Sequence, residues 1–334
     1  MADALPRIAL ADTGRETTRL GFGGAGLMGG LSERESLRLL ETAYDAGIRH
    51  FDVAPSYGHG AAERCLGKFL RGKLQHVTVT TKYGILPPRH SSMLGMARTM
   101  ARPVVRLTAK ALPSLRRSVA SAVAGLKSRG NFSVAEAKLS LDRSLRELGL
   151  DQIDVLLLHE ATAEDLADIA LLEFLQEQAR LGRIGSFGIG SDPTYIPALW
   201  EQRRAYCRVL QYDWPGWSAD VILYPGSFLI HHRVWNAHGS RLAALLEQDV
   251  PLRKRWSDAV DLDLSSRQNL AVLLITAALF AQHSGIVIVS SRTPVHILAN
   301  AHAAADAQWI TRAKRFRELV IRERIFQADI PLSR

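Results

Sequence analysis

Cysteine is scarce in this chain: Cys65 and Cys207 are the only two among 334 residues. Two cysteines allow one disulfide bond at most, and they fit no close-spaced zinc-binding pattern. Long apolar runs are missing too, since no stretch approaches the ~20 apolar residues that a membrane-spanning helix needs. Residues 1–15 contain acidic side chains and lack the apolar core of a signal peptide. We therefore expect a soluble, cytoplasmic protein whose cysteines are reduced and structural.

The overall composition is that of a globular protein. Hydrophobic residues make up 47% of the chain and charged residues 22%, and the mean hydropathy is close to zero. Neither a disordered nor a membrane-spanning class is therefore favoured. A chain of this length can bury one large core, although length alone also allows two domains.

Eight strand-like runs alternate with amphipathic stretches. The runs are Leu20–Gly23, His50–Ala54, Val77–Lys82, Ile153–His159, Ile184–Gly190, Arg208–Tyr212, Phe228–His232 and Ile286–Ser290. The stretches between them, with apolar residues at three- and four-residue spacing, include Glu33–Ala46, Val134–Leu148, Ala163–Leu181 and Ser265–Gln282. This alternation predicts a closed (β/α)8 TIM barrel that forms a single domain over residues 1–334. The alternative is a doubly wound open sheet with about six strands in one nucleotide-binding unit.

Two segments lie outside this alternation. Pro6–Thr18 carries a Thr13-Gly14 turn signal, which predicts an N-terminal β-hairpin that caps one end of the barrel. The second segment, residues 87–130, follows the third strand and is far longer than the two to six residues usual after a barrel strand. We call it the basic insertion.

The basic insertion holds the chain's excess positive charge. The formal net charge is +9, and no Asp or Glu occurs from Tyr83 to Ala135. Three interpretations stay open: a lid over an anionic substrate, an amphipathic anchor on an acidic membrane, or a solvated loop. A lid of this charge would favour carboxylated or phosphorylated substrates. No aromatic interleaving or known motif supports specific nucleic-acid recognition.

Four polar residues stand at or near the ends of predicted strands, where the catalytic groups of a barrel lie. Asp52 stands near the end of the second strand, Lys82 ends the third and His159 ends the fourth, while Tyr57 follows in the loop after the second strand. An isolated buried Asp or Lys would lose several kcal/mol of hydration. We therefore expect Asp52 and Lys82 to neutralise each other.

This set suits proton donation to a carbonyl oxygen. An unperturbed tyrosine has a pKa of about 10, which is too high for effective acid-base catalysis near neutrality. A lysine cation at roughly 4 Å favours phenolate by about 4 kcal/mol at an effective dielectric of ~20, or about three pKa units. We predict that Tyr57 is the acid, that Lys82 lowers its pKa, and that a neutral His159 orients the substrate oxygen. The hydride must come from a cofactor.

The motifs around these residues resemble those of the aldo-keto reductase superfamily. Phe51–Gly58, followed by Gly60, Glu63, Leu66 and Gly67, resembles its Asp-Tyr signature, Thr81–Gly84 its lysine strand, and Leu141–Leu148 with Leu156–His159 its helix and histidine strand. The resemblance covers nearly the whole chain outside the basic insertion. It implies a TIM barrel, reduction of an aldehyde or ketone with NADPH, and a catalytic tetrad of Asp52, Tyr57, Lys82 and His159.

The resemblance also implies a set of cofactor-binding residues. Gln211 corresponds to the family glutamine that reads the nicotinamide carboxamide, and Gly190-Ser191 stands where the family has a Ser-Asn pair. Ser291 and Arg292 can supply charge-assisted hydrogen bonds to a 2′-phosphate, which favours NADPH over NADH. The expected set is Gly23, Gly24, Asp52, Ser191, Gln211, His231, Ser291, Arg292, His296 and Asn300, with His231 as the stacking ring on the seventh strand.

Gly21–Gly26 satisfies the G-x-G-x-x-G pattern and is the best argument for the open-sheet alternative. That fingerprint also needs an acid at the end of the next strand, whereas Asp45 falls inside an amphipathic stretch. We interpret Gly23 and Gly24 as the first barrel turn, where glycines let the backbone approach the cofactor.

His231, His232 and His238 do not predict a metal site. Two adjacent histidines on a strand point to opposite faces, and no Cys, Asp or Glu nearby completes a ligand set. The loop Trp214–Trp217 offers an apolar surface that can line a substrate pocket.

Two functions are consistent with the sequence. The first is NADPH-dependent reduction of a small carbonyl compound, an anionic one if the basic insertion is a lid, with the proton supplied by Tyr57. The second is a cofactor-binding regulatory or interaction protein on the same barrel, which the altered Gly190-Ser191 pair and the basic insertion motivate.

Overall fold

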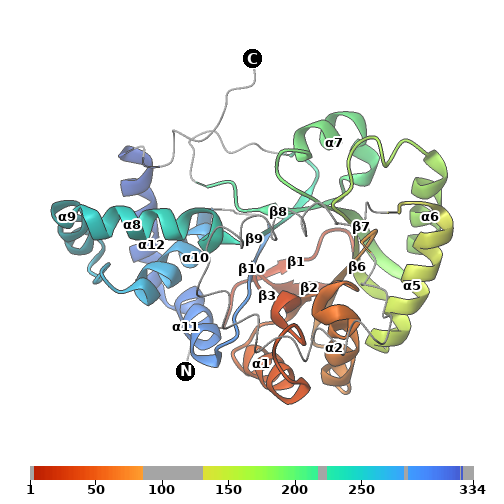
Figure 1. Cartoon of the computed structure of the whole chain (residues 1–334), viewed down its shortest axis with the longest axis horizontal. Coiled ribbons are helices and arrows are strands. Elements are labelled where there is room, and N and C mark those ends of the chain that lie inside the picture. Colours follow the sequence, from red (N-terminus) through yellow and green to blue (C-terminus); the bar gives the residue numbers. More distant parts are fainter. Residues whose placement is uncertain (1–3, 86–130, 217–223, 282–284, 324, 326–334) are drawn as a thin grey trace, which may run out of the picture.

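Eight parallel strands form a closed barrel surrounded by helices in the computed structural model, which describes residues 4–85, 131–216, 224–281, 285–323 and 325 (Figure 1). The barrel strands are β3 (Leu20–Gly23), β4 (His50–Asp52), β5 (Thr78–Tyr83), β6 (Ile153–His159), β7 (Ile184–Gly190), β8 (Val209–Asp213), β9 (Phe228–His232) and β10 (Gly285–Val289). Neighbouring strands follow chain order, and β10 pairs with β3 to close the barrel. The predicted TIM barrel is confirmed, and the open sheet is excluded.

Ten helices surround the barrel in the described residues, and at least five of them begin directly after a residue whose side chain caps the helix. The ten are α1 (Glu33–Asp45), α2 (Ala62–Leu70), α5 (Val134–Leu148), α6 (Ile169–Arg180), α7 (Ile196–Gln202), α8 (Ser240–Gln248), α9 (Val250–Val260), α10 (Arg267–Ala281), α11 (Pro294–Ala305) and α12 (Ala307–Arg322). Ser32 and Glu35 form a capping box on α1. Helix α6 begins at Ile169 rather than at Ala163, because the Asp168 side chain accepts a hydrogen bond from the Ala170 N–H and caps the helix there.

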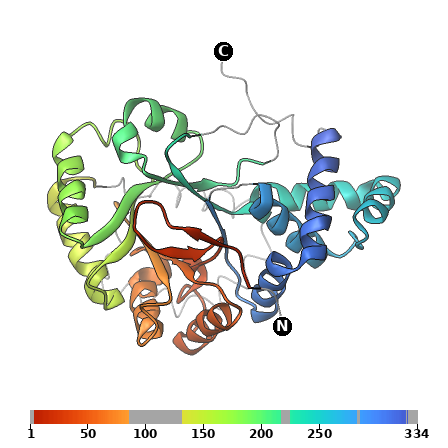
Figure 2. The same ribbon diagram turned by 180° about the vertical axis from the view of Figure 1, so that it is seen from behind.

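The N-terminal hairpin closes the end of the barrel where the strands begin. It consists of β1 (Arg7–Ala9) and β2 (Glu16–Thr18), seen in front of the barrel strands in Figure 2. Leu10 at its turn is fully buried and packs inside the barrel with Val155, Val209 and Ile286. Arg15 adds an ion pair with Asp154 at 2.7 Å. The predicted hairpin cap is confirmed, and it leaves the opposite end of the barrel for a site.

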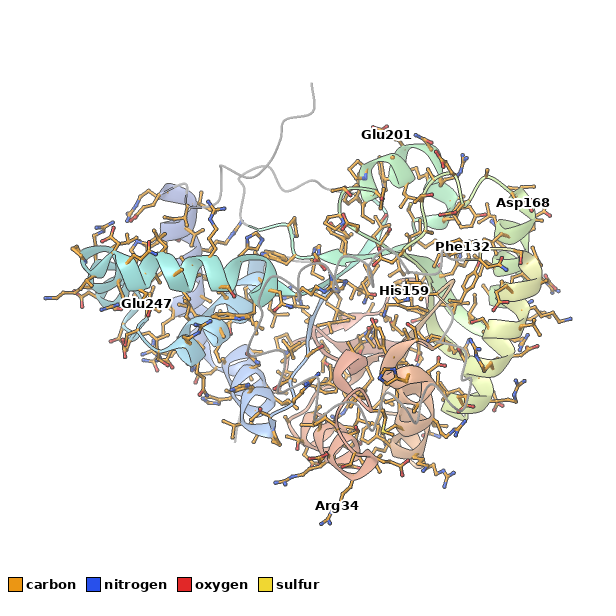
Figure 3. The ribbon with its side chains drawn as sticks, in the orientation of Figure 1. Arg34, Phe132, His159, Asp168, Glu201 and Glu247 are labelled. Atoms are coloured by element: carbon orange, nitrogen blue, oxygen red, sulfur yellow. The ribbon has the colours of Figure 1, made fainter. Side chains whose placement is uncertain are left out.

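Strand alternation determines which side chains face that opposite end. Side chains of the barrel interior include Leu157, Val209, Ile230 and Ile288, and residues two positions further along a strand share the same face. By this alternation, the inner side chains at or just beyond the strand ends are Asp52, Lys82, His159, Gln211, His232 and Ser290. Figure 3 shows His159 near the middle of the molecule, where the strands converge, while Arg34 and Glu247 lie at its periphery.

The basic insertion lies outside the described residues. Among the helices of the described ranges, none has the length and apolar character that crossing a bilayer would require.

Candidate active site

Asp52 and Lys82 form a buried ion pair at the ends of β4 and β5. The Lys82 ammonium donates to both carboxylate oxygens of Asp52 at 2.7 Å, and to the Val53 carbonyl at 3.3 Å. Their side chains are 3% and 7% exposed, so water screens the pair little. Burial alone would lower the pKa of Lys82, but the nearby Asp52 and Tyr57 outweigh burial and raise it. The lysine is therefore held as a cation.

Tyr57 lies above this pair in the loop after β4. The Lys82 ammonium is 5.5 Å from the centre of the Tyr57 ring, and the ring of His159, at the end of β6, meets it edge-on with 6.2 Å between centroids. The four residues singled out from the sequence therefore gather within one site, although they come from three strands and a loop.

The pKa of Tyr57 does not follow the sequence prediction. Burial raises it above its ordinary value, and the positive charge and hydrogen bond of Lys82 act in the opposite, predicted direction. Asp52 raises the pKa further, because its carboxylate offsets much of the lysine charge at the phenol. The predicted net lowering is therefore wrong, since burial and the carboxylate outweigh the positive charge near the phenol.

A cavity of about 690 Å³ opens beside Tyr57 and Asp52. The sequence-predicted residues among those that line it are Gly23, Asp52, Tyr57, Ser291, His296 and Asn300. Lys82 and Gln211 lie behind this wall and contact it through Asp52. Gly23 leaves necessary space, because a Cβ there would come within 2.4 Å of the Ser290 hydroxyl oxygen.

Gln211 is positioned by the Asp52 carboxylate. Its Nε2 donates to Asp52 at 2.8 Å, while its Oε1 is buried with no hydrogen-bond partner among the described residues. An unsatisfied buried carbonyl costs about 1–3 kcal/mol. The side chain is therefore ready to accept a hydrogen bond from a ligand amide.

The far side of the cavity combines small polar side chains with basic ones. Ser291 bonds within its own turn to Thr293 and contacts His296 Nδ1 at 3.5 Å. Asn300 donates to the His296 carbonyl at 2.8 Å, and its buried Oδ1 has no partner in the described ranges. Arg292 is exposed and lies beside Gly26, whose Cβ would be 3.7 Å from the arginine Cγ. This arrangement can receive an anionic group and an amine.

Besides Gln211 and Arg292, three of the predicted cofactor-binding residues do not line the cavity: Ser191, Gly24 and His231. Ser191 is buried and donates to the Ala161 carbonyl at 3.0 Å. Gly24 packs against β4, where its Cβ would be 3.0 Å from the Asp52 carbonyl. His231 is also buried, and its ring contacts Tyr212 and Trp214 outside the barrel. For these three the geometry shows packing rather than an open ligand surface.

The error at His231 has a simple cause. His231 pairs with Tyr212 in the sheet, and His232 pairs with Asp213. Strand alternation puts the first pair outside the barrel and the second inside, so His232 lines the cavity where His231 was expected. Its Nδ1 is 2.8 Å from the Asp213 carboxylate. The sequence prediction was displaced by one residue.

Several cavity residues were missed by sequence analysis. They are His232, Arg233, Trp235, Asn236, Arg267 and Gln268. Trp235 begins a π-helical turn, Trp235–Gly239, a feature that often accompanies functional sites. Strand alternation was the one sequence signal for any of these residues. It predicts that one of the two adjacent histidines, His231 or His232, faces the barrel interior, but it does not decide which. Trp214 is buried and does not appear in the cavity wall.

In the described residues, no three His, Cys, Asp or Glu side chains come together as a metal site would require. Cys65 and Cys207 are free and buried, and burial raises the pKa of Cys65 to about 11.

Comparison with known proteins identifies one family. Its model, described as the Aldo/keto reductase family, matches residues 19–212. The chain is 35% identical over 194 residues to D-threo-aldose 1-dehydrogenase of a Pseudomonas species, covering 55% of this chain and 53% of that protein. It is 31% identical over 198 residues to pyridoxal 4-dehydrogenase of Microbacterium luteolum, covering 54% of each. The chain thus spans about half the length of these relatives.

Solved structures share the fold over more of the chain. An aldo-keto reductase from Bacillus halodurans in its holo form matches with a TM-score of 0.62 and 18% identity, covering 93% of this chain and 96% of that one. An aldo-keto reductase from Klebsiella pneumoniae in complex with NADPH matches with a TM-score of 0.60 and 17% identity, covering 95% and 96%. At these identities the likeness shows the fold.

Proposed function

Since the chain belongs to the aldo/keto reductase family, we propose that it is an NADPH-dependent oxidoreductase that reduces an aldehyde or ketone to an alcohol, with Tyr57 as the proton donor. The observation that carries this proposal is the position of Tyr57. It lines a cavity of about 690 Å³, with the buried cation of Lys82 5.5 Å from its ring centre and the His159 ring 6.2 Å away.

The residues present fit the proposed cofactor. The buried Gln211 Oε1 can accept a hydrogen bond from the carboxamide of nicotinamide, and the buried Asn300 Oδ1 can accept one from the amine of adenine. Ser291, Arg292 and His296 stand close enough together to bind a 2′-phosphate. The Klebsiella protein of the same fold was solved with NADPH, and this supports the assignment.

NADPH, when bound, supplies the hydride for the carbonyl carbon. The chain's own residues manage the proton and the oxygen. Tyr57 holds a proton that its buried position keeps in place, and Lys82 stabilises the phenolate that forms when the proton passes to the substrate oxygen. His159 lies beside the phenol and orients that oxygen by a hydrogen bond. Asp52 keeps Lys82 charged and in position.

The direct test is oxidation of NADPH by the purified chain against a panel of aldehydes and ketones, with a fluorescence titration of NADPH binding alongside. We expect saturable NADPH binding and turnover of at least one carbonyl compound. Binding without turnover of any panel member would contradict the reductase.

That contrary outcome would favour the second candidate, a cofactor-binding regulatory protein. One observation supports this candidate: the Ser191 hydroxyl donates to Ala161, and at Gly190 there is no side chain to contact a carboxamide. Absence of NADPH binding would remove both functions.

A further inference from the structure

The wall of the cavity carries more positive than negative charge. Apart from histidines, its charged residues are Asp52, Arg233 and Arg267. Among the described residues that line the cavity, Asp52 is the only acid, and both its oxygens accept hydrogen bonds from Lys82 at 2.7 Å. The charge of Asp52 is therefore offset, and the two arginines give the cavity its net charge. A cavity of this kind attracts an anionic ligand.

Arg233 stands at the catalytic side of the cavity. It follows β9 directly, and Tyr57 experiences its positive charge, which lowers the pKa of the phenol in the same direction as Lys82 does. Arg267 is placed differently, at the first residue of α10, with its guanidinium 5.7 Å from the centre of the Trp235 ring. Arg267 is thus suited to a cofactor phosphate, and Arg233 to a group carried by the substrate.

The backbone at Arg233 is held in an unusual conformation. Its φ is +56°, a left-handed value that costs a non-glycine residue roughly 1–3 kcal/mol. Such strain persists at functional sites, where the surroundings fix it. The neighbouring His232 is held by Asp213 at 2.8 Å, so the strand end is fixed just before the turn.

The guanidinium of Arg233 keeps most of its hydrogen-bonding capacity. Its Nη1 lies 3.5 Å from the Asp213 carboxylate, which is closer to His232, and its side chain is 62% exposed. An arginine has five N–H donors in a planar fork that matches a carboxylate. One long contact to Asp213 leaves this fork available.

We propose that the substrate is an aldehyde or ketone that also carries a carboxylate, and that Arg233 binds this carboxylate while the carbonyl oxygen faces Tyr57. The proposal rests on the proposed reductase function and specifies its substrate class. Arg233 is then a residue that determines specificity, because a neutral carbonyl compound gains nothing from it.

The test compares two probes that differ by one charge, para-carboxybenzaldehyde and its methyl ester, in the full chain with NADPH. Charge-assisted hydrogen bonds are worth about 1.5–3 kcal/mol, or roughly 10- to 100-fold in an equilibrium constant. The wild type should therefore prefer the acid by about that factor in kcat/KM. Arg233→Met should lose the preference, with KM for the acid rising by about that factor relative to KM for the ester. The matched control is Arg180→Met, an exposed arginine on α6 paired with Glu177, which should keep the preference.

Other outcomes overturn the proposal in distinguishable ways. Equal turnover of acid and ester by the wild type would show that no carboxylate is recognised. An Arg233→Met variant that binds NADPH more weakly and loses both probes equally would place Arg233 on the cofactor instead. Calorimetric titration of para-carboxybenzyl alcohol into the NADPH complex adds a readout independent of turnover. Binding that Arg233→Met abolishes would support the carboxylate site even if the proposed reaction failed, and binding that it leaves unchanged would contradict it.

Discussion

Tyr57 illustrates how opposing effects set the property of one residue. Burial and the Asp52 carboxylate raise the pKa of the phenol, and Lys82 and Arg233 counteract them. The phenol is therefore protonated near neutrality, which is the form that an acid must have before it donates a proton. In the proposed reaction, its acidity matters only when negative charge develops on a substrate oxygen beside it, and Lys82 would then stabilise the phenolate left behind.

Two buried histidines should make the protein sensitive to acid. Burial lowers the pKa of His50 to about 4, with its ring nitrogens bonded to Thr78 and Thr80, and burial lowers the pKa of His231 to about 3. An unfolded histidine has a pKa of about 6.5. Below that value the unfolded chain binds more protons than the folded one, so the stability present above pH 6.5 is lost progressively as pH falls towards 4.

We expect each of these histidines to reduce the free energy of unfolding by about 2 kcal/mol between pH 7 and pH 5. Urea unfolding at the two pH values measures this loss. His50→Gln should show a smaller loss than the wild type, whereas replacement of the exposed His76 should leave it unchanged. If wild type and His50→Gln lose equal stability, the buried His50 is not the neutral group that the structure indicates.

At the scale of elements, the sequence predicted the bounds of helices and strands best where nearby residues mark their ends. Strand β6 and helix α5 have the predicted bounds, because a continuous buried run marks the strand and the capping residues Ser133 and Gly149 mark the ends of the helix. The meeting of Asp52 and Lys82 was also predictable, since adjacent parallel strands end at the same side and a buried charge needs a partner.

The missed features depend on distant elements or on burial depth. Arg267 reaches the cavity from a helix beyond β9, and the left-handed backbone of Arg233 has no signature in the sequence. The sequence prediction named His231 as the stacking ring, whereas His232 lines the cavity. Nothing in the sequence decides which of two adjacent histidines on a strand faces the inside of the barrel. The pKa of Tyr57 depends on how deeply the loop is buried, which a count of nearby charges does not give.

The packing of α2 against α5 depends on one glycine. A Cβ on Gly67 would lie 2.3 Å from the Glu147 carbonyl oxygen and 2.9 Å from the Leu148 backbone, and these are main-chain atoms that cannot rotate away. Alanine is favoured over glycine within a helix by ~1 kcal/mol, whereas overpacking costs typically 1–3 kcal/mol or more. The clash is severe, so the second effect should prevail.

We expect Gly67→Ala to reduce the free energy of unfolding by about 2 kcal/mol, measured by urea denaturation. Gly29→Ala is the matched control, since its Cβ would meet no atom closer than 3.8 Å and should cause little change. An unchanged or raised stability of Gly67→Ala would mean that the two helices are not in close contact.

At the scale of the whole molecule, the two ends of the barrel have separate roles. Leu10 and the Arg15–Asp154 ion pair close the end where the strands begin. The other end carries the ion pair of Asp52 and Lys82, the Tyr57 phenol and the cavity. Because of this division, the residues at the cavity end can differ in sequence without disturbing the apolar packing that the hairpin and the barrel interior supply at the other end.

The most direct test of the proposed chemistry measures one hydride-transfer step in Tyr57→Phe, which removes only the phenolic hydroxyl. Single-turnover kinetics with preloaded NADPH and the best carbonyl compound of the panel should show a rate lowered by roughly 10²- to 10⁴-fold, because a positioned general acid contributes about that much. The Kd for NADPH should stay at its wild-type value. A Tyr57→Phe variant that transfers hydride at the wild-type rate would contradict the assignment of Tyr57 as the proton donor.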